Sequence, residues 1–245
     1  LTSLNKSDEA PFQYGHLSLK DILAVRDKRL AQTIDTVLLY NGRGFTRFNT
    51  GMESTSSTGY GVAKYDNEAI PEGFRSQSGK NYTHAPLFWL SVIYLNYAEA
   101  CAELGNITQD DLDKSINLLK DRAGLPHLNP IVGFSDPANN HGVSDLIWEI
   151  RRERRCELMF DNDNRYWDLI RWHQLDKLDT TKYPDIILGA NVANDMDGCE
   201  ANKVGKYIDG SKDGSRIYDK KHYLYPIPTG QIALNPQLAP NNPGW

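Results

Sequence analysis

Residues 84–105 place the tightest constraint on the fold, because almost every residue after Pro86 is apolar or small. Pro86 suits the first turn of a helix and Gly105 suits its end, which predicts a helix over 85–104. The large apolar side chains recur three and four residues apart, but others fill the remaining faces. A helix that is apolar on most sides is packed on most sides, so other helices are expected to surround this one.

A second helix is predicted over 110–123, because aspartates begin it, Lys120 and Arg122 end it, and Gly124 follows. Together the two segments resemble one degenerate tetratricopeptide hairpin. A single hairpin cannot bury its own faces, so partner helices must come from elsewhere. The pattern also predicts helices near 17–26, 144–160 and 164–174, and a short strand over 33–40.

The predicted fold is mainly α, with tetratricopeptide-like helical hairpins, long irregular loops and few short strands. Residues 1–245 are treated as one region with three parts. These parts are a variable loop region over 40–82, a helical scaffold over 84–175 and a loop-rich tail over 176–245. A loop as long as the first part is usually functional rather than incidental.

Charge and hydropathy exclude several classes of protein. The 27 Lys and Arg against 32 Asp and Glu leave a net charge of −5, which disfavours a nucleic-acid binder. No apolar run is long enough for a transmembrane helix. The chain begins LTSLNKSDEAPFQYG, which lacks the features of a secretory signal. The chain is therefore either cytoplasmic or a processed or truncated piece.

The segment SDLIWEIRRERRCELMF invites several interpretations. Its arginines suggest a basic patch, but Glu149, Glu153 and Glu157 follow one line of the helix and nearly cancel them. Hydrophobic residues are interleaved around the axis, which favours an ion-pair network between helices over an anion site or catalytic carboxylates. The scattered histidines and the absence of hydrolase, phosphate-binding and metalloprotease motifs predict no catalytic residue, metal site or cofactor.

The loop region over 40–82 is rich in aromatic residues set among glycines and amides. Aromatic faces with polar neighbours suit flat, partly apolar ligands such as sugar rings. The alternative is that the rings pin the loops to the helical body. The candidate ligand-binding residues are Tyr40, Phe45, Phe48 and Tyr60 as platforms, with Asn41, Arg43 and Arg47 as hydrogen-bond donors.

Five segments together resemble the SusD/RagB family of outer-membrane nutrient-binding lipoproteins. The most specific is RRERRCELMFDNDNRYWDLIRW, whose turn over 161–164 departs from the shorter turn that the family usually has. The others are RDKRLAQTI, LFWLSVIYLNYAEACAELG, INLLKDRAGLP and YLYPIPTGQIALNPQLAPNNPGW. The resemblance covers almost the whole chain. Family members are about twice as long, so this chain resembles their C-terminal half, without the N-terminal half, the signal peptide or the lipidated cysteine.

The resemblance implies a SusD-like α/α superhelix that binds oligosaccharide or polysaccharide without catalysis or cofactors. It also implies a surface-exposed outer-membrane lipoprotein that delivers nutrient to a SusC-like TonB-dependent transporter. Contact with the membrane would come only through a lipid anchor that is missing from this chain. The family's ligand residues lie in variable loops, so none can be transferred by position. The motif residues that are expected to be scaffold are Glu99, Arg151, Glu153, Arg154, Glu157, Asp168 and Arg171.

Two other functions compete with glycan binding. A helical-repeat adaptor would bind a protein, but it should show several regular hairpins where the sequence shows one degenerate hairpin. A glycan-cleaving helical barrel would need more hairpins and a pair of facing carboxylates. The loop-rich segments over 40–82 and 176–222 argue against that barrel.

Overall fold

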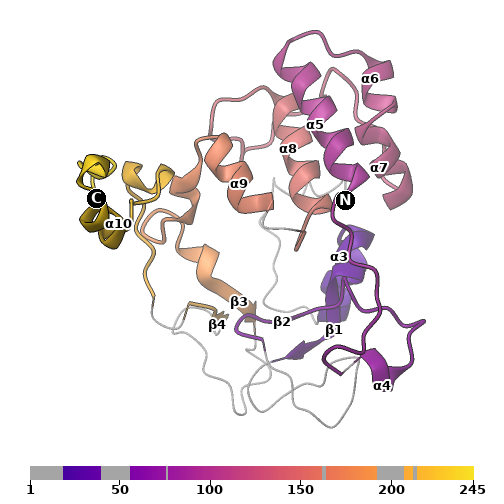
Figure 1. The fold of residues 1–245 in the computed structure, drawn as a ribbon. Coiled ribbons are helices and arrows are strands. Elements are labelled where there is room, and N and C mark those ends of the chain that lie inside the picture. Colours follow the sequence, from indigo (N-terminus) through magenta and orange to yellow (C-terminus); the bar gives the residue numbers. More distant parts are fainter. Residues whose placement is uncertain (1–18, 40–55, 76, 162–163, 192–206, 212–213) are drawn as a thin grey trace.

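The computed structural model describes residues 19–39, 56–75, 77–161, 164–191, 207–211 and 214–245, and there the chain is mainly helical (Figure 1). The elements in chain order are α2 (Leu19–Val25), α3 (Lys28–Thr33), β1 (Ile34–Leu39), β2 (Gly59–Val62), α4 (Glu72–Arg75), α5 (Leu90–Glu103), α6 (Gln109–Asp113), α7 (Ile116–Ala123), α8 (Asp145–Glu157), α9 (Asn164–Arg171), η2 (Leu175–Leu178), η3 (Pro184–Ile187), β3 (Leu188–Asn191), β4 (Tyr207–Asp209), η4 (Lys220–Tyr223), α10 (Thr229–Leu234) and η5 (Pro236–Leu238).

The main hydrophobic core lies between α5, α6, α7 and α8. Helix α5 packs along α8, while α6 and α7 cover a second side of α5 (Figure 1). The buried core side chains are Leu95, Ala98, Ala102, Leu112, Ile116, Leu119, Leu128, Ile150 and Leu158. The predicted fold class, mainly α with few short strands, is therefore confirmed.

Two of the predicted helices differ from the structure. Helix α5 begins at Leu90 and not near 85, because Trp89 is extended and serves as its N-cap. The helix predicted over 110–123 is broken into α6 and α7. The Ser115 hydroxyl donates to the carbonyl of Asp111 at 2.5 Å. Such back-bonding by serine competes with the backbone ladder and bends helices, which accounts for the interruption.

The helices near 17–26, 144–160 and 164–174 are confirmed with shorter bounds. Helix α8 is capped by Ser144, whose hydroxyl accepts from the Ile147 amide at 3.3 Å. Helix α3 was not predicted as a separate element. The Asp27 side chain caps it by accepting from the Arg29 amide at 2.9 Å, so the chain turns between α2 and α3.

The strand predicted over 33–40 is confirmed as β1. Strands β2, β3 and β4 lie in segments that were predicted to be irregular. The described strands are three to six residues long and form two separate two-stranded sheets. They hold far less of the chain than the quarter that is typical of mixed domains.

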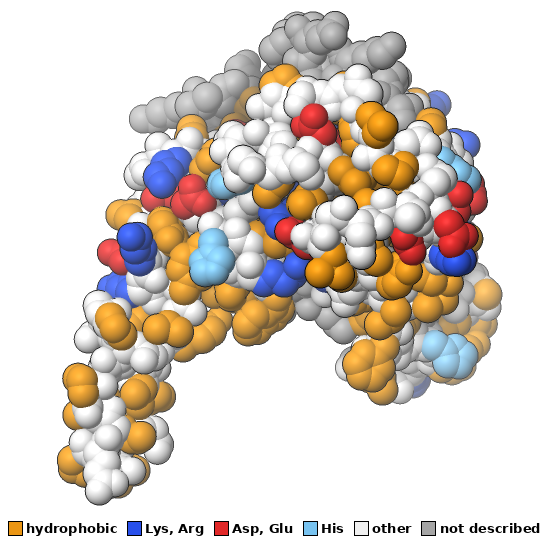
Figure 2. All heavy atoms as spheres, turned by 90° about the horizontal axis from the view of Figure 1, so that it is seen from above, with side chains coloured by type: hydrophobic (Ala, Val, Ile, Leu, Met, Phe, Trp, Pro, Cys, Tyr) orange, Lys and Arg blue, Asp and Glu red, His pale blue; other side chains and the backbone are white. Residues whose placement is uncertain are grey.

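The C-terminal tail, which was predicted only to be loop-rich, folds on itself. The Asn241 side chain pairs with both backbone groups of Ile227, at 2.8 and 3.0 Å. This arm, which carries α10 and η5, projects from the body and leaves a hollow beside it (Figures 1 and 2). Among the described residues, no helix has the length and apolar character needed to cross a membrane.

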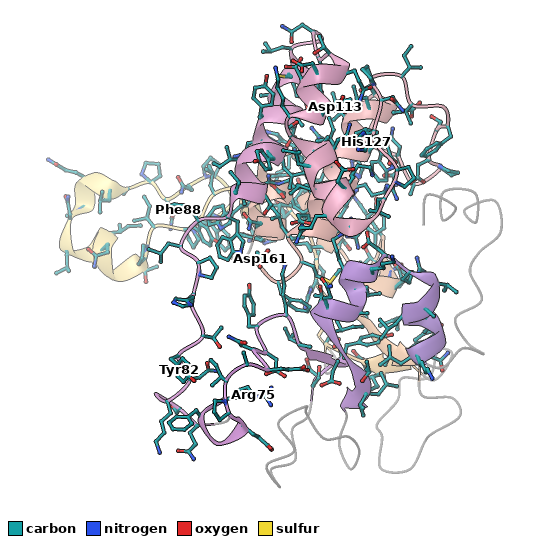
Figure 3. All side chains as sticks on the ribbon, turned by 90° about the vertical axis from the view of Figure 1, so that its right-hand side faces the viewer. Arg75, Tyr82, Phe88, Asp113, His127 and Asp161 are labelled. Carbon is teal, nitrogen blue, oxygen red and sulfur yellow. The ribbon has the colours of Figure 1, made fainter. Side chains whose placement is uncertain are left out.

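Helix α5 is covered by α8 on one side and by α6 and α7 on another, but a third face stays exposed, contrary to the expectation that helices surround it. Leu90, Ile93, Tyr97 and Leu104 lie three, four and seven residues apart and are exposed by 62%, 59%, 46% and 76%. Phe88, just before the helix, is 90% exposed and points outward (Figure 3). A contiguous apolar face of this kind usually marks an interface.

We expect the 245-residue chain to associate with itself through this face of α5. Leu90→Lys combined with Ile93→Lys should shift the chain toward a monomer, because the lysines keep the stripe hydrated. Sedimentation velocity over a range of concentrations measures the shift. The control is Ile131→Lys in the 127–142 loop, because Ile131 is 88% exposed but lies off the helix. If the parent chain is monomeric at every concentration, this prediction is wrong.

Candidate functional site

Two β-hairpins meet at the place where the predicted ligand-binding segment joins the fold. Strands β1 and β2 are antiparallel, with Leu38 opposite Tyr60. Strands β3 and β4 are also antiparallel, with Asn191 opposite Tyr207. The Ala190 amide donates to the Thr58 carbonyl at 2.8 Å, which joins the start of β2 to β3. The ends of the hairpin segments 40–55 and 192–206 are therefore attached to one common base.

Two glycines allow the hairpins to approach this closely. A Cβ on Gly59 would lie 2.6 Å from the Ile208 side chain, and the Gly59 φ of 81° also favours glycine. A Cβ on Gly189 would lie only 2.3 Å from the Thr58 carbonyl oxygen. Larger residues at either position would push the hairpins apart, so the base depends on both glycines.

Tyr60 is the one predicted ligand-binding residue that the structure describes. It is half-buried and packs with Leu38 against the buried side chains of Ala190 and Ile208. Burial and the nearby Tyr207 hydroxyl raise the pKa of Tyr60, so its hydroxyl stays protonated at neutral pH. Tyr60 supports the hairpin base, and its exposed part remains available to a ligand.

The other six predicted residues, Tyr40, Asn41, Arg43, Phe45, Arg47 and Phe48, lie outside the described residues. Their role stays a prediction. The second hairpin was not recognised in the sequence, where 176–222 was read only as turn-rich. The alternation of apolar and polar residues that marks a strand is too short over 188–191 and 207–209 to be recognised. The aromatic Tyr207 was the one signal in that segment.

Buried glutamates of α8 form a network with cations from two other helices, α3 and α7. Glu153 accepts a hydrogen bond from Arg29 of α3 and lies 3.6 Å from the ammonium of Lys120 of α7. Glu157 accepts from Arg29 at 2.9 Å and from Arg122 at 2.5 Å. One arginine therefore bridges two turns of α8, and the predicted ion-pair network is confirmed for these residues.

Two further carboxylates, Glu149 and Asp27, extend this network of ion pairs. Glu149 is buried and accepts from Arg152 at 3.0 Å. Asp27 accepts from Arg29 at 3.0 Å. Burial opposes the charge of Arg29, but the hydrogen bonds from Arg29 to Asp27 and Glu153 outweigh it and raise its pKa above the usual range. Arg29 therefore stays charged at every pH at which the protein is folded.

A second ionic centre joins α5, α8 and α9. Glu99 accepts from Arg171 at 2.6 Å and from the indole of Trp172 at 2.6 Å. Burial raises the pKa of Glu99, but these bonds and the Arg171 charge outweigh it and hold the pKa below its ordinary value. Asp168 accepts from Arg154 at 2.7 Å. These motif residues have the scaffold role that was expected of them.

The buried carboxylates of Glu99, Glu153, Glu157 and Asp168 are therefore all engaged in ion pairs. Among the described residues, no group of three or more His, Cys, Asp or Glu side chains could hold a metal ion. What the hairpin base can offer instead is aromatic surface, amide groups and hydroxyls. Such groups suit reversible binding of a polar ring.

An aromatic cavity of about 290 Å³ lies at the start of the C-terminal arm. Tyr225 is 65% exposed at its mouth, and its hydroxyl lies 3.2 Å from that of Tyr166. The indole of Trp245 donates to the Leu224 carbonyl at 2.9 Å, which holds the ring beside the cavity. This cavity was not anticipated from the sequence, because its residues come from α9, η4 and the tail.

A family model described as the SusD family matches residues 23–245. The chain belongs to the SusD family. This match includes both hairpins, the helical body and the C-terminal arm. The resemblance that the motifs indicated is thereby confirmed over nearly the whole chain.

A solved structure of a SusD-like protein shares the fold. A SusD-like carbohydrate-binding protein from Bacteroides fragilis is 24% identical with a TM-score of 0.60, and the match covers 97% of this chain and 47% of that one. A second SusD-like protein from the same organism is 23% identical with a TM-score of 0.46, covering 86% of this chain and 38% of that one. The chain thus spans about half the length of the SusD-like structures. A comparison with curated proteins found no match.

Glu153→Ala is expected to destabilise this SusD-family chain by about 3–5 kcal/mol, because it leaves Arg29 and Lys120 buried without their shared carboxylate. Chemical denaturation measures the change. Glu103→Ala is the matched control, since Glu103 pairs with Arg151 at 3.0 Å but its side chain is 49% exposed. Equal stability of the two variants would contradict the network.

Acid should weaken the Glu99 centre. The folded pKa of Glu99 lies below its ordinary value near 4.5, so its contribution is complete above that value and is lost as the pH falls through the folded pKa. Glu99→Gln should be less stable than the parent at pH 7 and should lose less stability below about pH 5. Melting temperatures across this range test the prediction, and parallel curves for the two proteins would contradict it.

Proposed function

We propose that this chain is part of a cell-surface protein that binds oligosaccharide or polysaccharide and delivers it to a SusC-like TonB-dependent transporter. The SusD-family match over residues 23–245 is the observation that carries the proposal. A structural relative with a TM-score of 0.60 is described as a carbohydrate-binding protein, which supports a glycan as the ligand. The chain spans about half of that relative, so the complete site can include residues outside it.

The proposed ligand surface is the 40–60 segment above the hairpin base. Tyr40, Phe45, Phe48 and Tyr60 would stack against sugar rings, and their neighbours Asn41, Arg43 and Arg47 would donate hydrogen bonds to sugar hydroxyls. Support comes from the shared base, where the strands that flank 40–55 are joined to those that flank 192–206. Binding residues are commonly carried by loops on such a scaffold.

We propose a non-catalytic role that needs no cofactor. The buried carboxylates of α8 and α9 are held by arginines and lysines, so they are unavailable as a general acid or a nucleophile. A glycosidase needs two carboxylates across the scissile bond. A reducing-end assay on any bound oligosaccharide tests this part, because released ends would indicate cleavage.

The proposed location is the outer face of the outer membrane, with attachment through a lipid anchor outside this sequence. The proposed partner is the SusC-like transporter, and delivery requires only that the glycan be released unchanged. Co-purification of the full-length natural protein with such a transporter tests the partnership. Recovery without any transporter would count against it.

Phe48→Ala and Tyr60→Ala are expected to weaken glycan affinity several-fold, since a stacked ring contributes on the order of 1 kcal/mol. Tyr60→Ala should also lower the melting temperature, because Tyr60 packs against Ala190 and Ile208. A glycan array identifies the ligand, and calorimetry then measures affinity per folded molecule.

The matched control for this pair is Tyr82→Ala. Tyr82 lies in the same predicted loop region and is 63% exposed, but it contacts Phe74 and not the hairpin base. Tyr225→Ala tests the aromatic cavity in the same assay. Loss of affinity in Tyr225→Ala alone would move the ligand to that cavity and would overturn the loop platform.

A further inference from the structure

Two arginines at the junction of α8 and α9 stand apart from the ion-pair network. Within the described part of the chain, neither Arg155 nor Arg165 has a side-chain hydrogen bond or a carboxylate within 4 Å. The guanidinium of Arg165 lies 5.9 Å from the Trp172 ring centre, and Arg155 is exposed. Both side chains line a cavity of about 430 Å³.

The acidic groups of this cavity already have partners. Asp168 accepts from Arg154 at 2.7 Å and lies 3.1 Å from Arg171. Asp161 accepts from Lys64 at 2.7 Å and from the Tyr65 hydroxyl at 2.6 Å. Their negative charges are therefore balanced locally, whereas among the described residues Arg155 and Arg165 have no carboxylate of their own within 4 Å, and Asp168 offsets the charge of Arg165 only from a distance.

The positive charge at this junction lowers the pKa of two cations, Arg165 and Lys177. Burial and the adjacent Arg155 lower the pKa of Arg165 to about 10. Burial and the same two arginines lower the pKa of Lys177, in η2, to about 8. Cations that lower one another's pKa values in this way repel one another. A bound anion would offset this repulsion and stabilise their charged forms.

An exposed aromatic ring sits at the rim of the same cavity. Phe160 has a φ of 64° and is 53% exposed. A bulky residue in the left-handed region is strained, and such strain concentrates at functional sites. Two neighbours from the end of β2 hold the turn. Lys64 donates to the Met159 carbonyl at 2.9 Å, and the Tyr65 hydroxyl donates to the Phe160 carbonyl at 2.9 Å.

We propose that this cavity binds an acidic sugar residue, with Arg155 and Arg165 pairing with its carboxylate or sulfate oxygens and Phe160 stacking against its ring. The proposal rests on the proposed function, because it assumes that the ligand is a glycan, and it adds that the glycan is anionic. Arginine suits this role because its planar guanidinium can donate two parallel hydrogen bonds to such groups. The cavity, at about 430 Å³, has room for a ring as well as its anionic group.

The site is distinct from the 40–60 platform but is attached to the same hairpin. Lys64 and Tyr65 follow β2 directly, and both contact the turn that carries Phe160. In Figure 3, Asp161 lies between the helices and the region of α4. A glycan chain that reaches both places would be held by aromatic stacking at the platform and by charge at the cavity.

The test uses the 245-residue chain and three oligosaccharides of equal length: an oligogalacturonate, which carries only carboxylates, a κ-carrageenan oligosaccharide, which carries only sulfates, and neutral maltohexaose. Calorimetry should show that one of the two acidic probes binds and that added salt weakens it. Arg165→Gln should weaken that binding by about tenfold or more, as expected for a lost charge-assisted bond. Phe160→Ala should weaken it several-fold. The two acidic probes distinguish a carboxylate from a sulfate.

Two control variants separate binding from folding. Lys80→Gln removes an exposed charge on the segment between α4 and α5 and should leave acidic-probe binding unchanged. Arg154→Gln breaks the buried pair with Asp168 and should lower the melting temperature. Arg165→Gln should leave the melting temperature equal or higher, because it removes a charge that has no ion-pair partner among the described residues. If Arg165→Gln melts lower, as Arg154→Gln does, then Arg165 is structural and the proposal is overturned.

The remaining outcomes separate this proposal from the proposed function. Glycan binding that ignores the charge of the probe, and is unaffected by Arg165→Gln, overturns the acidic site and leaves the proposed function standing. Stabilisation by inorganic sulfate without binding of either acidic probe also overturns it, because the cavity would then hold a small anion only. Failure to bind any glycan on an array of neutral and acidic glycans counts against the proposed function itself.

Discussion

The contact on which the arrangement of the described chain depends is the one between Arg29 and the glutamates of α8. Arg29 stands on α3, directly before β1, and reaches both Glu153 and Glu157. At the other end of the hairpin, Lys64 donates to the carbonyls of Glu157 and Met159. The β1–β2 hairpin is thereby fixed to the end of α8 from both sides by charged side chains.

Fixing a hairpin by buried charge is costly in stability. Each ion must leave water, and the attraction between partners often does no more than offset that loss. The ion pairs instead define the position of the hairpin, because a guanidinium that bonds to Asp27, Glu153 and Glu157 at once can occupy only one position. An apolar contact of similar area would tolerate sliding. For a base that presents two loop segments together, a defined position is worth more than added stability.

The helices could be predicted from the sequence where their signals are local. Three local signals each mark a helix to within a few residues. They are the apolar residues between Pro86 and Gly105, the aspartates before 113, and Ser144 at the start of α8. The break at Ser115 could not be foreseen, because it depends on whether one hydroxyl bonds to its own helix or to solvent. The short strands were missed because three or four residues carry too little alternation.

The candidate sites were predictable to different degrees. The aromatic richness of 40–60 is visible in composition, but its common base with β3 and β4 follows from a contact between Thr58 and Ala190, which are far apart in the sequence. In the sequence of α8, the negative charges of the glutamates nearly balance the positive charges of the arginines. Only the fold decides which of them are paired. Arg154 pairs with Asp168, whereas Arg155, one residue later, has no described carboxylate within 4 Å.

That difference of one residue follows from helical geometry. Successive side chains on α8 are about 100° apart, so neighbours face different surroundings. Position 154 faces α9 and α5, where its guanidinium reaches Asp168 and Asn96 at 2.7 and 2.9 Å. Position 155 faces the cavity that Arg165 also lines. The run of arginines on α8 therefore serves two purposes: Arg151, Arg152 and Arg154 pair with carboxylates and hold the scaffold together, whereas Arg155 places positive charge at the cavity for which we propose anion binding.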